Sequence, residues 1–150
     1  MKSSILQFDD EVLCYEEQER WDEAITYLYE KWKKEGSLSS VLCLGTQLWY
    51  TMYLLEIDEN SSNDPDFYLK EPMDRYSNML TEVTQFGREY YSNTSSYNVY
   101  FGYLFKVKPY LFADFNGDWD GWVQMGVKMM KNAHKYNPND IVAQYVQYRA

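Results

Sequence analysis

One stretch of the chain, residues 19–32, places its large apolar side chains at the spacing of a single helical face. These side chains are Trp21, Ala24, Ile25, Leu28, Tyr29 and Trp32. Positions three, four and seven residues apart lie on the same side of an α-helix. Ala24 is small and lies in the middle of this face, so a second helix can approach it closely. The stretch therefore predicts an amphipathic helix over about residues 20–35, ended by Gly36.

The same periodicity continues through most of the chain and predicts an all-α protein. Helices are expected over about residues 4–17, 20–35, 38–57, 72–91, 97–107 and 119–136, with a short one after 137–140. Ser37 and Asp118 are expected to cap the third and sixth helices, and Pro109 should kink the fifth or end it near Val107. Residues 58–66 and 92–96 are rich in Asn, Ser and Asp and are expected to be loops. The chain is predicted to be a single domain, residues 1–150, of six or seven helices stacked as antiparallel hairpins.

Two parts of the chain resemble the tetratricopeptide repeat, in which a pair of helices recurs every ~34 residues. The matching residues are Tyr15, Ala24 and Leu28; Leu44, Gly45 and Leu48; and Gly126, Met130, Ala133 and Pro138. The small residues stand where the two helices of a hairpin touch. The resemblance covers roughly the first and last thirds, because residues 73–106 carry no repeat signature. It implies a degenerate tetratricopeptide-like stack, and an irregular helical bundle is the alternative.

The chain is acidic, with 14 Lys or Arg against 23 Asp or Glu and a net charge of -9. Such a charge repels nucleic acid and anionic membranes, so neither is expected as a partner. No apolar segment precedes the first acidic residues and no apolar run approaches a membrane span, which predicts a cytoplasmic protein. Cys14 and Cys43 are expected to be buried thiols, although a disulfide between them is an open alternative.

No catalytic or cofactor motif is present. His134 is the only histidine, and two separated cysteines cannot form a zinc cluster with it. Residues 114–120 alternate oxygen-bearing side chains as calcium loops do, but the twelfth position holds Val127 or Met125 in place of the bidentate Glu. The alternative is a capped turn with acidic residues at a helix N-terminus. The sequence therefore predicts no enzyme activity, no cofactor and no metal site.

Two acidic, turn-rich stretches adjoin aromatic residues and are the candidate partner-binding sites. The first contains Glu56, Asp58, Glu59, Asp64, Asp66 and Tyr68, and the second contains Asp114, Asp118, Trp119 and Asp120. Acidic clusters steer a basic protein toward a surface, and an aromatic anchor then holds it. The sequence contains 16 Tyr and 5 Trp, residues that suit interfaces as well as cores.

In its size, acidity and tyrosine content, the chain resembles the small immunity proteins of bacterial contact-dependent inhibition and related toxin systems. Because no motif carries this resemblance, it assigns no role to a particular residue. It implies a cytoplasmic protein that binds a cognate basic toxin domain of the nuclease type and blocks its active site. The alternative is a tetratricopeptide-like adaptor or chaperone that holds a peptide in a helical groove.

Overall fold

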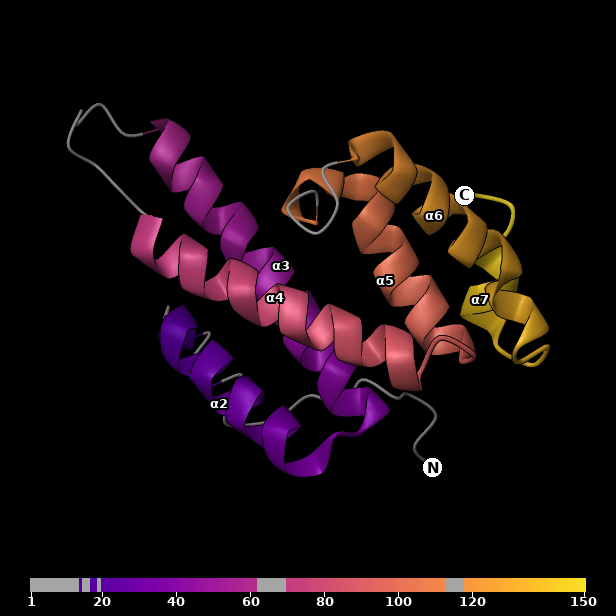
Figure 1. Cartoon of the computed structure of the whole chain (residues 1–150), viewed down its shortest axis with the longest axis horizontal. Helices are drawn as coiled ribbons and strands as arrows, with labels where there is room; N and C mark the ends of the chain where they lie inside the picture. Colours follow the sequence, from indigo (N-terminus) through magenta and orange to yellow (C-terminus); the bar gives the residue numbers. More distant parts are fainter. Residues whose placement is uncertain (1–13, 15–16, 19, 62–69, 113–117) are drawn as a thin grey trace. The chain divides into compact units, whose positions relative to one another are not determined.

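The computed structural model describes residues 14, 17, 18, 20–61, 70–112 and 118–150, with the backbone alone for 57–61, 70 and 71. Regular structure within these ranges is entirely helical, without a strand, so the predicted all-α class is confirmed (Figure 1). The α-helices are α2 (Trp21–Glu35), α3 (Leu38–Ser61), α4 (Lys70–Tyr90), α5 (Ser95–Val107), α6 (Trp119–Asn132) and α7 (Ile141–Val146). Two short 3-10 helices are η1 (Pro109–Leu111) and η3 (Ala133–Lys135). Among the described helices, none has the length and apolar character needed to span a membrane.

Several predicted helix ends are confirmed by their capping geometry. Gly36 adopts a left-handed conformation, with φ of 59°, and its N–H donates to the carbonyl of Trp32 at the end of α2. The Ser37 hydroxyl accepts a hydrogen bond of 3.1 Å from the backbone N–H of Ser40. The Asp118 carboxylate accepts one of 3.0 Å from the N–H of Gly121. Pro109 begins η1 directly after α5.

Other predicted boundaries were wrong or cannot be assessed. Residues 58–61 are the end of α3 and not part of a loop, because no Gly or Pro interrupts the chain before Pro65. The last α-helical residue of α6 is Asn132, and residues 133–135 tighten into η3. α4 begins two residues earlier than expected, which still leaves Pro72 in its first turn. The predicted helix over residues 4–17 lies almost wholly outside the described residues.

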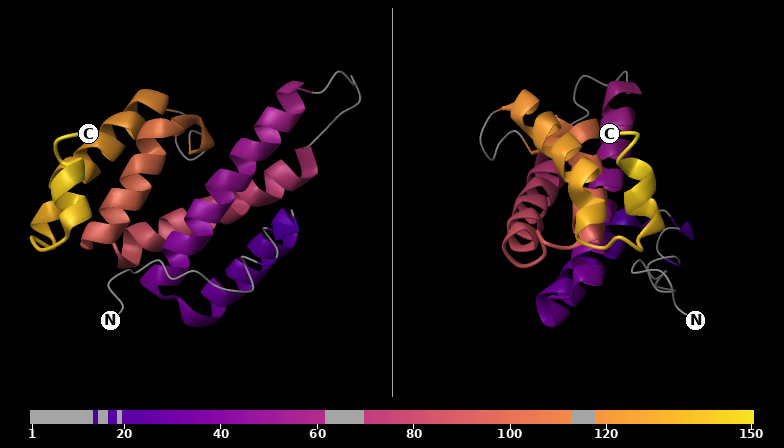
Figure 2. Two further views of the ribbon diagram at one scale, coloured as in Figure 1. Left: turned by 180° about the vertical axis from the view of Figure 1, so that it is seen from behind. Right: turned by 90° about the vertical axis from the view of Figure 1, so that its right-hand side faces the viewer.

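The chain divides into two compact units, residues 1–83 and 84–150, and the boundary falls inside α4. The first unit contains α2, α3 and the first part of α4. In Figures 1 and 2, α2 and α3 form one helical hairpin, and α4 runs opposite to α3. The single-domain assignment remains a prediction.

The core of the first unit is built from the predicted helical stripes. Its buried apolar residues include Ala24, Ile25, Leu28 and Trp32 of α2, Val41, Leu42, Leu44, Leu48 and Met52 of α3, and Tyr76, Leu80 and Val83 of α4. Trp21 and Tyr29 were predicted to lie on the same buried face, but both are only half-buried. The Trp21 ring lies edge-on to the exposed ring of Tyr50, with 6.0 Å between centroids. It therefore covers the rim of the core and does not fill its centre.

The second unit is organised by the close packing of α5 on α6. A methyl group added at Gly102 would lie 2.9 Å from the carbonyl oxygen of Gly126. One added at Gly126 would lie 2.8 Å from the backbone nitrogen of Lys106, and closer still to the Gly102 oxygen. Gly126 thus lies where two helices touch, as its repeat position suggested. The structure establishes helical hairpins; the tetratricopeptide-like detail remains a prediction.

This close approach brings aromatic rings from both helices into one core. Phe105 of α5 packs edge-on against Phe112 and Trp122, at centroid distances of 4.6 and 4.8 Å. The helical spacing of Trp119 and Trp122 at the start of α6 would suggest that both are buried, but Trp119 is 56% exposed. It is the first residue of α6 and packs on the ring of Tyr110 instead of entering the core.

Replacing Leu48 with Ala should lower the free energy of unfolding by about 2–5 kcal/mol, because this side chain is fully buried. Trp21→Ala should cost less, since its ring is half-buried at the rim. Urea denaturation of both variants measures the difference. A larger loss for Trp21→Ala would show that the rim contributes more than the centre of the core.

Gly126→Ala should destabilise the protein by about 1–3 kcal/mol, because the added methyl group meets backbone atoms that cannot rotate away. Gln124→Ala on the exposed side of the same helix is the matched control and should have little effect or stabilise slightly. Urea midpoints compare the two. Equal midpoints would contradict the close packing of α5 on α6.

Candidate functional site

The first predicted acidic stretch lies at the end of α3. Glu56 is half-buried, and Asp58 and Glu59 follow in the last turns of the helix, where the backbone alone is described. The predicted residues Asp64, Asp66 and Tyr68 lie outside the described residues. The structure therefore places the described half of this candidate site on a helix and not in a loop.

Acidic residues at this end of α3 work against the helix dipole. The last backbone carbonyls of a helix carry partial negative charge, so cations there stabilise it and anions destabilise it. The last turn of α3 contains no basic residue. The sequence therefore puts formal negative charge, at Asp58 and Glu59, in the turn whose carbonyls already carry partial negative charge.

The second predicted stretch is described from Asp118 onward, and Asp114 lies outside the described residues. Asp118, Trp119 and Asp120 are all exposed at the start of α6. Asp118 caps the helix and Asp120 lies in its first turn, so the capped-turn interpretation is confirmed for these residues. Within the described part of the chain, no group of three or more His, Cys, Asp or Glu residues could hold a metal ion. The absence of a calcium site remains a prediction, since residues 114–117 are not described.

Sequence reasoning missed the support beneath Trp119. The Tyr110 ring lies 5.7 Å from the Trp119 ring, and the Lys108 ammonium lies 5.4 Å from the Tyr110 centroid. The indole is thus held by a neighbouring ring while more than half of its surface stays exposed. Pro109 indicated the end of α5, but no local sequence pattern indicates that the next residue, Tyr110, packs against Trp119. We call Tyr110, Asp118, Trp119 and Asp120 the Trp119 turn.

The acidic end of α3 and the Trp119 turn belong to different compact units, and these units differ sharply in charge. Residues 1–83 contain seven Lys or Arg and eighteen Asp or Glu, a net charge of -11. Residues 84–150 contain seven Lys or Arg and five Asp or Glu, a net charge of +2. All of the net acidity therefore resides in the first unit.

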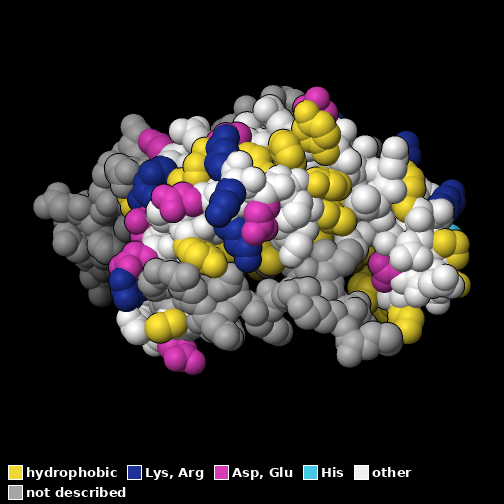
Figure 3. Space-filling model, turned by 90° about the horizontal axis from the view of Figure 1, so that it is seen from below, with side chains coloured by type: hydrophobic (Ala, Val, Ile, Leu, Met, Phe, Trp, Pro, Cys, Tyr) yellow, Lys and Arg dark blue, Asp and Glu magenta, His cyan; other side chains and the backbone are white. Residues whose placement is uncertain are grey.

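Some acidic residues of the first unit are used within the fold. The Asp22 carboxylate lies 2.7 Å from the Arg75 guanidinium and accepts a hydrogen bond of 2.6 Å from the Tyr76 hydroxyl. Glu82 likewise accepts a hydrogen bond of 2.9 Å from the Tyr29 hydroxyl and forms an ion pair with Lys33. Both clusters join α2 to α4. Figure 3, which views the molecule from the α2 side, shows charges of opposite sign side by side on this face.

These contacts shift the pKa values of the groups involved. Burial alone raises the pKa of Asp22, but the hydrogen bonds from Tyr76 and Arg75 outweigh it and hold that pKa below its usual value. Burial and the neighbouring Asp22 carboxylate raise the pKa of the Tyr76 hydroxyl. The hydrogen bond to Glu82 raises the pKa of Lys33. The two clusters are therefore structural contacts that favour the charged forms of Asp22 and Lys33.

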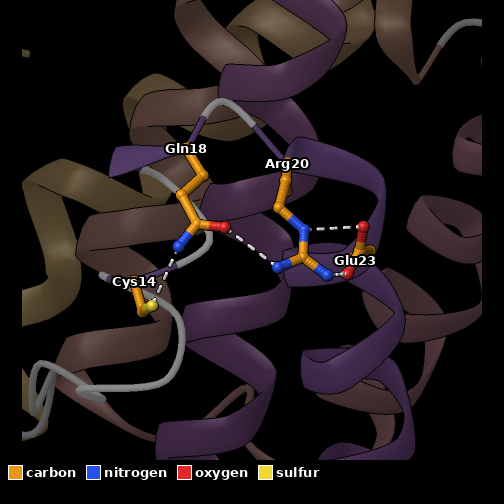
Figure 4. A network of polar contacts seen from close by, with 4 residues as sticks. All are labelled: Cys14, Gln18, Arg20 and Glu23. Atoms are coloured by element: carbon orange, nitrogen blue, oxygen red, sulfur yellow. Dashed lines mark hydrogen bonds and ion pairs between the residues drawn. The ribbon is translucent and has the colours of Figure 1, made fainter.

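A further polar network lies before and in the first turn of α2 (Figure 4). Arg20 donates to both carboxylate oxygens of Glu23, and the hydrogen bond from its Nε to Oε1 is 2.8 Å long. It also donates to the side-chain oxygen of Gln18, at 3.0 Å. The Gln18 amide in turn lies 3.5 Å from the sulfur of Cys14. Cys14 is exposed and Cys43 is half-buried, and neither of these two described cysteines forms a disulfide. The expectation of a buried thiol is therefore wrong for Cys14, which lies before α2 and is exposed.

Comparisons of the chain with protein-family models, with curated proteins and with solved structures gave no match. The functional argument below therefore rests on the charge, exposure and helix geometry of the chain itself.

Tyr76→Phe removes the hydroxyl that donates to Asp22 and should lower the free energy of unfolding by about 1 kcal/mol at pH 7. Because the folded-state pKa of Asp22 is depressed, its contribution is present above the unfolded pKa of about 3.9 and is lost as pH falls through the folded value. The variant should therefore lose less stability than the wild type between pH 5 and pH 2. Urea titrations across that range, with Tyr50→Phe as the control, measure the difference. Parallel profiles would contradict the assignment.

Proposed function

We propose that this chain is a binding protein that docks a basic protein domain on the acidic end of α3. In its specific form, the proposal is a cytoplasmic immunity protein that neutralises a cognate nuclease-type toxin by covering its active site. The observation that carries it is the cluster of Glu56, Asp58 and Glu59 on the last turns of α3, in a unit with a net charge of -11. The resemblance to small acidic immunity proteins supports the same conclusion.

The helix geometry supports a binding role because the acidic cluster is costly to the isolated protein. Each carboxylate near the negative end of a helix typically costs about 0.3–1 kcal/mol at low ionic strength. A basic partner offsets this repulsion when it binds, and its own positive charge lowers the free energy of the complex further. Proteins often accept lower stability where a surface has such a task. Nucleases bind phosphates with basic surfaces, so an acidic surface competes for the same groups.

The Trp119 turn, in the second unit, is a separate candidate contact that offers an aromatic anchor. Interfaces obtain most of their affinity from a few large side chains, with Trp prominent among them, and rim charges act mainly on the association rate. Trp119 is exposed, is backed by Tyr110, and stands between two carboxylates. It is the best-supported anchor of the candidates predicted from the sequence.

The alternative function, a tetratricopeptide-like adaptor, differs in the kind of ligand it would bind. Affinity purification from a lysate separates the two proposals. A single basic protein bound with nanomolar affinity supports the immunity function, whereas several peptide ligands with weak affinity support the adaptor. Inhibition of the captured protein's nuclease activity then tests the specific form of the proposal.

The double variant Asp58→Asn and Glu59→Gln should be more stable than the wild type by about 1 kcal/mol at low salt, because repulsion with the helix dipole is relieved. With Glu56→Gln added, the triple variant should associate more slowly with the basic partner, and its deficit should shrink in high salt. Urea denaturation and stopped-flow association measure the two effects.

The matched control neutralises three exposed acidic residues elsewhere in the described part of the unit: Glu17, Glu30 and Glu35. It changes the net charge equally and should slow association less. Trp119→Ala should leave folding nearly unchanged and raise the dissociation rate. If both triple variants slow association equally, net charge alone attracts the partner and the end of α3 is not the docking site.

A further inference from the structure

Three exposed lysines follow one side of α6 and continue into η3: Lys128, Lys131 and Lys135. They are spaced i, i+3 and i+7, so they share one side of the helix. The buried residues Trp122 and Met130 lie on the opposite side, which packs into the second unit. We call the three lysines the lysine face of α6.

The lysine face has no acidic counterpart in the part of the chain that the structure describes. None of its three ammonium groups has a hydrogen bond, an ion pair or a ring contact there. The other four cations of the second unit are all engaged. Arg88, Lys108 and Arg149 lie over aromatic rings, and Lys106 donates to a backbone carbonyl. Exposed helices commonly mix both signs of charge, whereas this side of α6 carries one sign only.

An acidic surface complementary to the lysine face is present on the chain itself. The first unit carries a net charge of -11 and the second one of +2. Within the first unit, Asp22 and Glu82 are already paired with cations between α2 and α4. Asp58 and Glu59 stand in the last turn of α3, which contains no basic residue. The acidic end of α3 is therefore the carboxylate-rich surface that best matches three unpaired ammonium groups.

From this match, we infer that the lysine face of α6 binds the acidic end of α3 of a second copy of the chain. Such a contact is heterologous, because each copy contributes a different surface. Whole copies repel each other, since each carries a net charge of -9. At physiological salt, charges more than about 8 Å apart are largely screened, so the opposite charges that meet at the contact decide the outcome. The association is therefore weak and specific to this pair of surfaces.

A second copy and a basic partner then compete for the same end of α3. This consequence rests on the proposed function, whereas the self-association does not. Binding of the basic partner releases the second copy, and a high concentration of the chain lowers the apparent affinity for the partner.

Sedimentation velocity of the full chain without any partner, from about 10 μM to about 1 mM, covers weak association. The wild type should shift from monomer to dimer and larger species, because a heterologous contact can repeat. Neutralising the lysine face with Lys128→Gln, Lys131→Gln and Lys135→Gln should raise the dissociation constant about 10-fold, since each exposed ion pair contributes little alone.

The matched control changes the net charge equally at three exposed amide side chains outside α6. It combines Asn78→Asp, Gln85→Glu and Asn93→Asp. These replacements keep the shape of each side chain, and the control should associate much more strongly than the neutralised lysine variant. Equal weakening in both would show that net charge alone governs association, and the inference would be wrong.

A charge exchange identifies the two surfaces that meet. One variant reverses the lysine face to Glu at all three positions, and the other carries Asp58→Lys and Glu59→Lys. Neither should associate with itself, because each then presents like charges at the contact. An equimolar mixture should associate, since the acidic α3 end of the first variant meets the lysine face of the second. Circular dichroism checks that both are folded, and the Gln variant keeps the test valid if the Glu variant is not.

Three results would overturn the inference: a wild type that stays monomeric at about 1 mM, a Gln variant that associates like the wild type, and a mixture of folded reversed variants that stays monomeric. A monomeric wild type that binds a short DNA duplex through the same lysines would identify a phosphate-binding face instead. Because every measurement is made without the basic partner, failure here is distinct from failure of the proposed function.

Discussion

Repulsion among acidic residues is the constraint under which the first unit must fold. α2 and α4 approach each other through two clusters in which a carboxylate meets both a cation and a tyrosine hydroxyl: Asp22 with Arg75 and Tyr76, and Glu82 with Lys33 and Tyr29. Partly exposed ion pairs contribute little by themselves. Most of the stabilisation comes from the apolar stripes buried between the helices, and the polar clusters fix how α2 and α4 align.

The second unit is constrained by packing and not by repulsion, because its charge is nearly balanced and its core is aromatic. Large rings such as those of Phe105 and Trp122 need helices that pack closely on one side and leave room on the other. Gly102 and Gly126 provide the close side. The remaining aromatic side chains exceed what this small core encloses, and some of them therefore lie on the surface at Trp119 and along α7.

The division of charge between the units bears directly on the proposed function. The first unit carries a net charge of -11 and the second one of +2, so a basic protein is attracted to the first. In the proposal, the acidic end of α3 is the part of that unit where the attraction is used.

The sequence alone determined the helical class and several helix ends, because periodicity and capping act over only a few residues. Gly36, Asp118 and Pro109 end or begin helices where their local chemistry requires it. The tertiary structure decided which positions of each stripe are deeply buried: Trp32 enters the core, whereas Trp119 stays exposed. It also decided which polar side chains contact each other. Asp22 and Tyr76 are 54 residues apart in sequence, so only the packing of α4 on α2 brings them together. The candidate acidic residues were visible in the sequence, but only the structure shows that α3 continues to Ser61, so that Asp58 and Glu59 lie in its last turn and not in a loop.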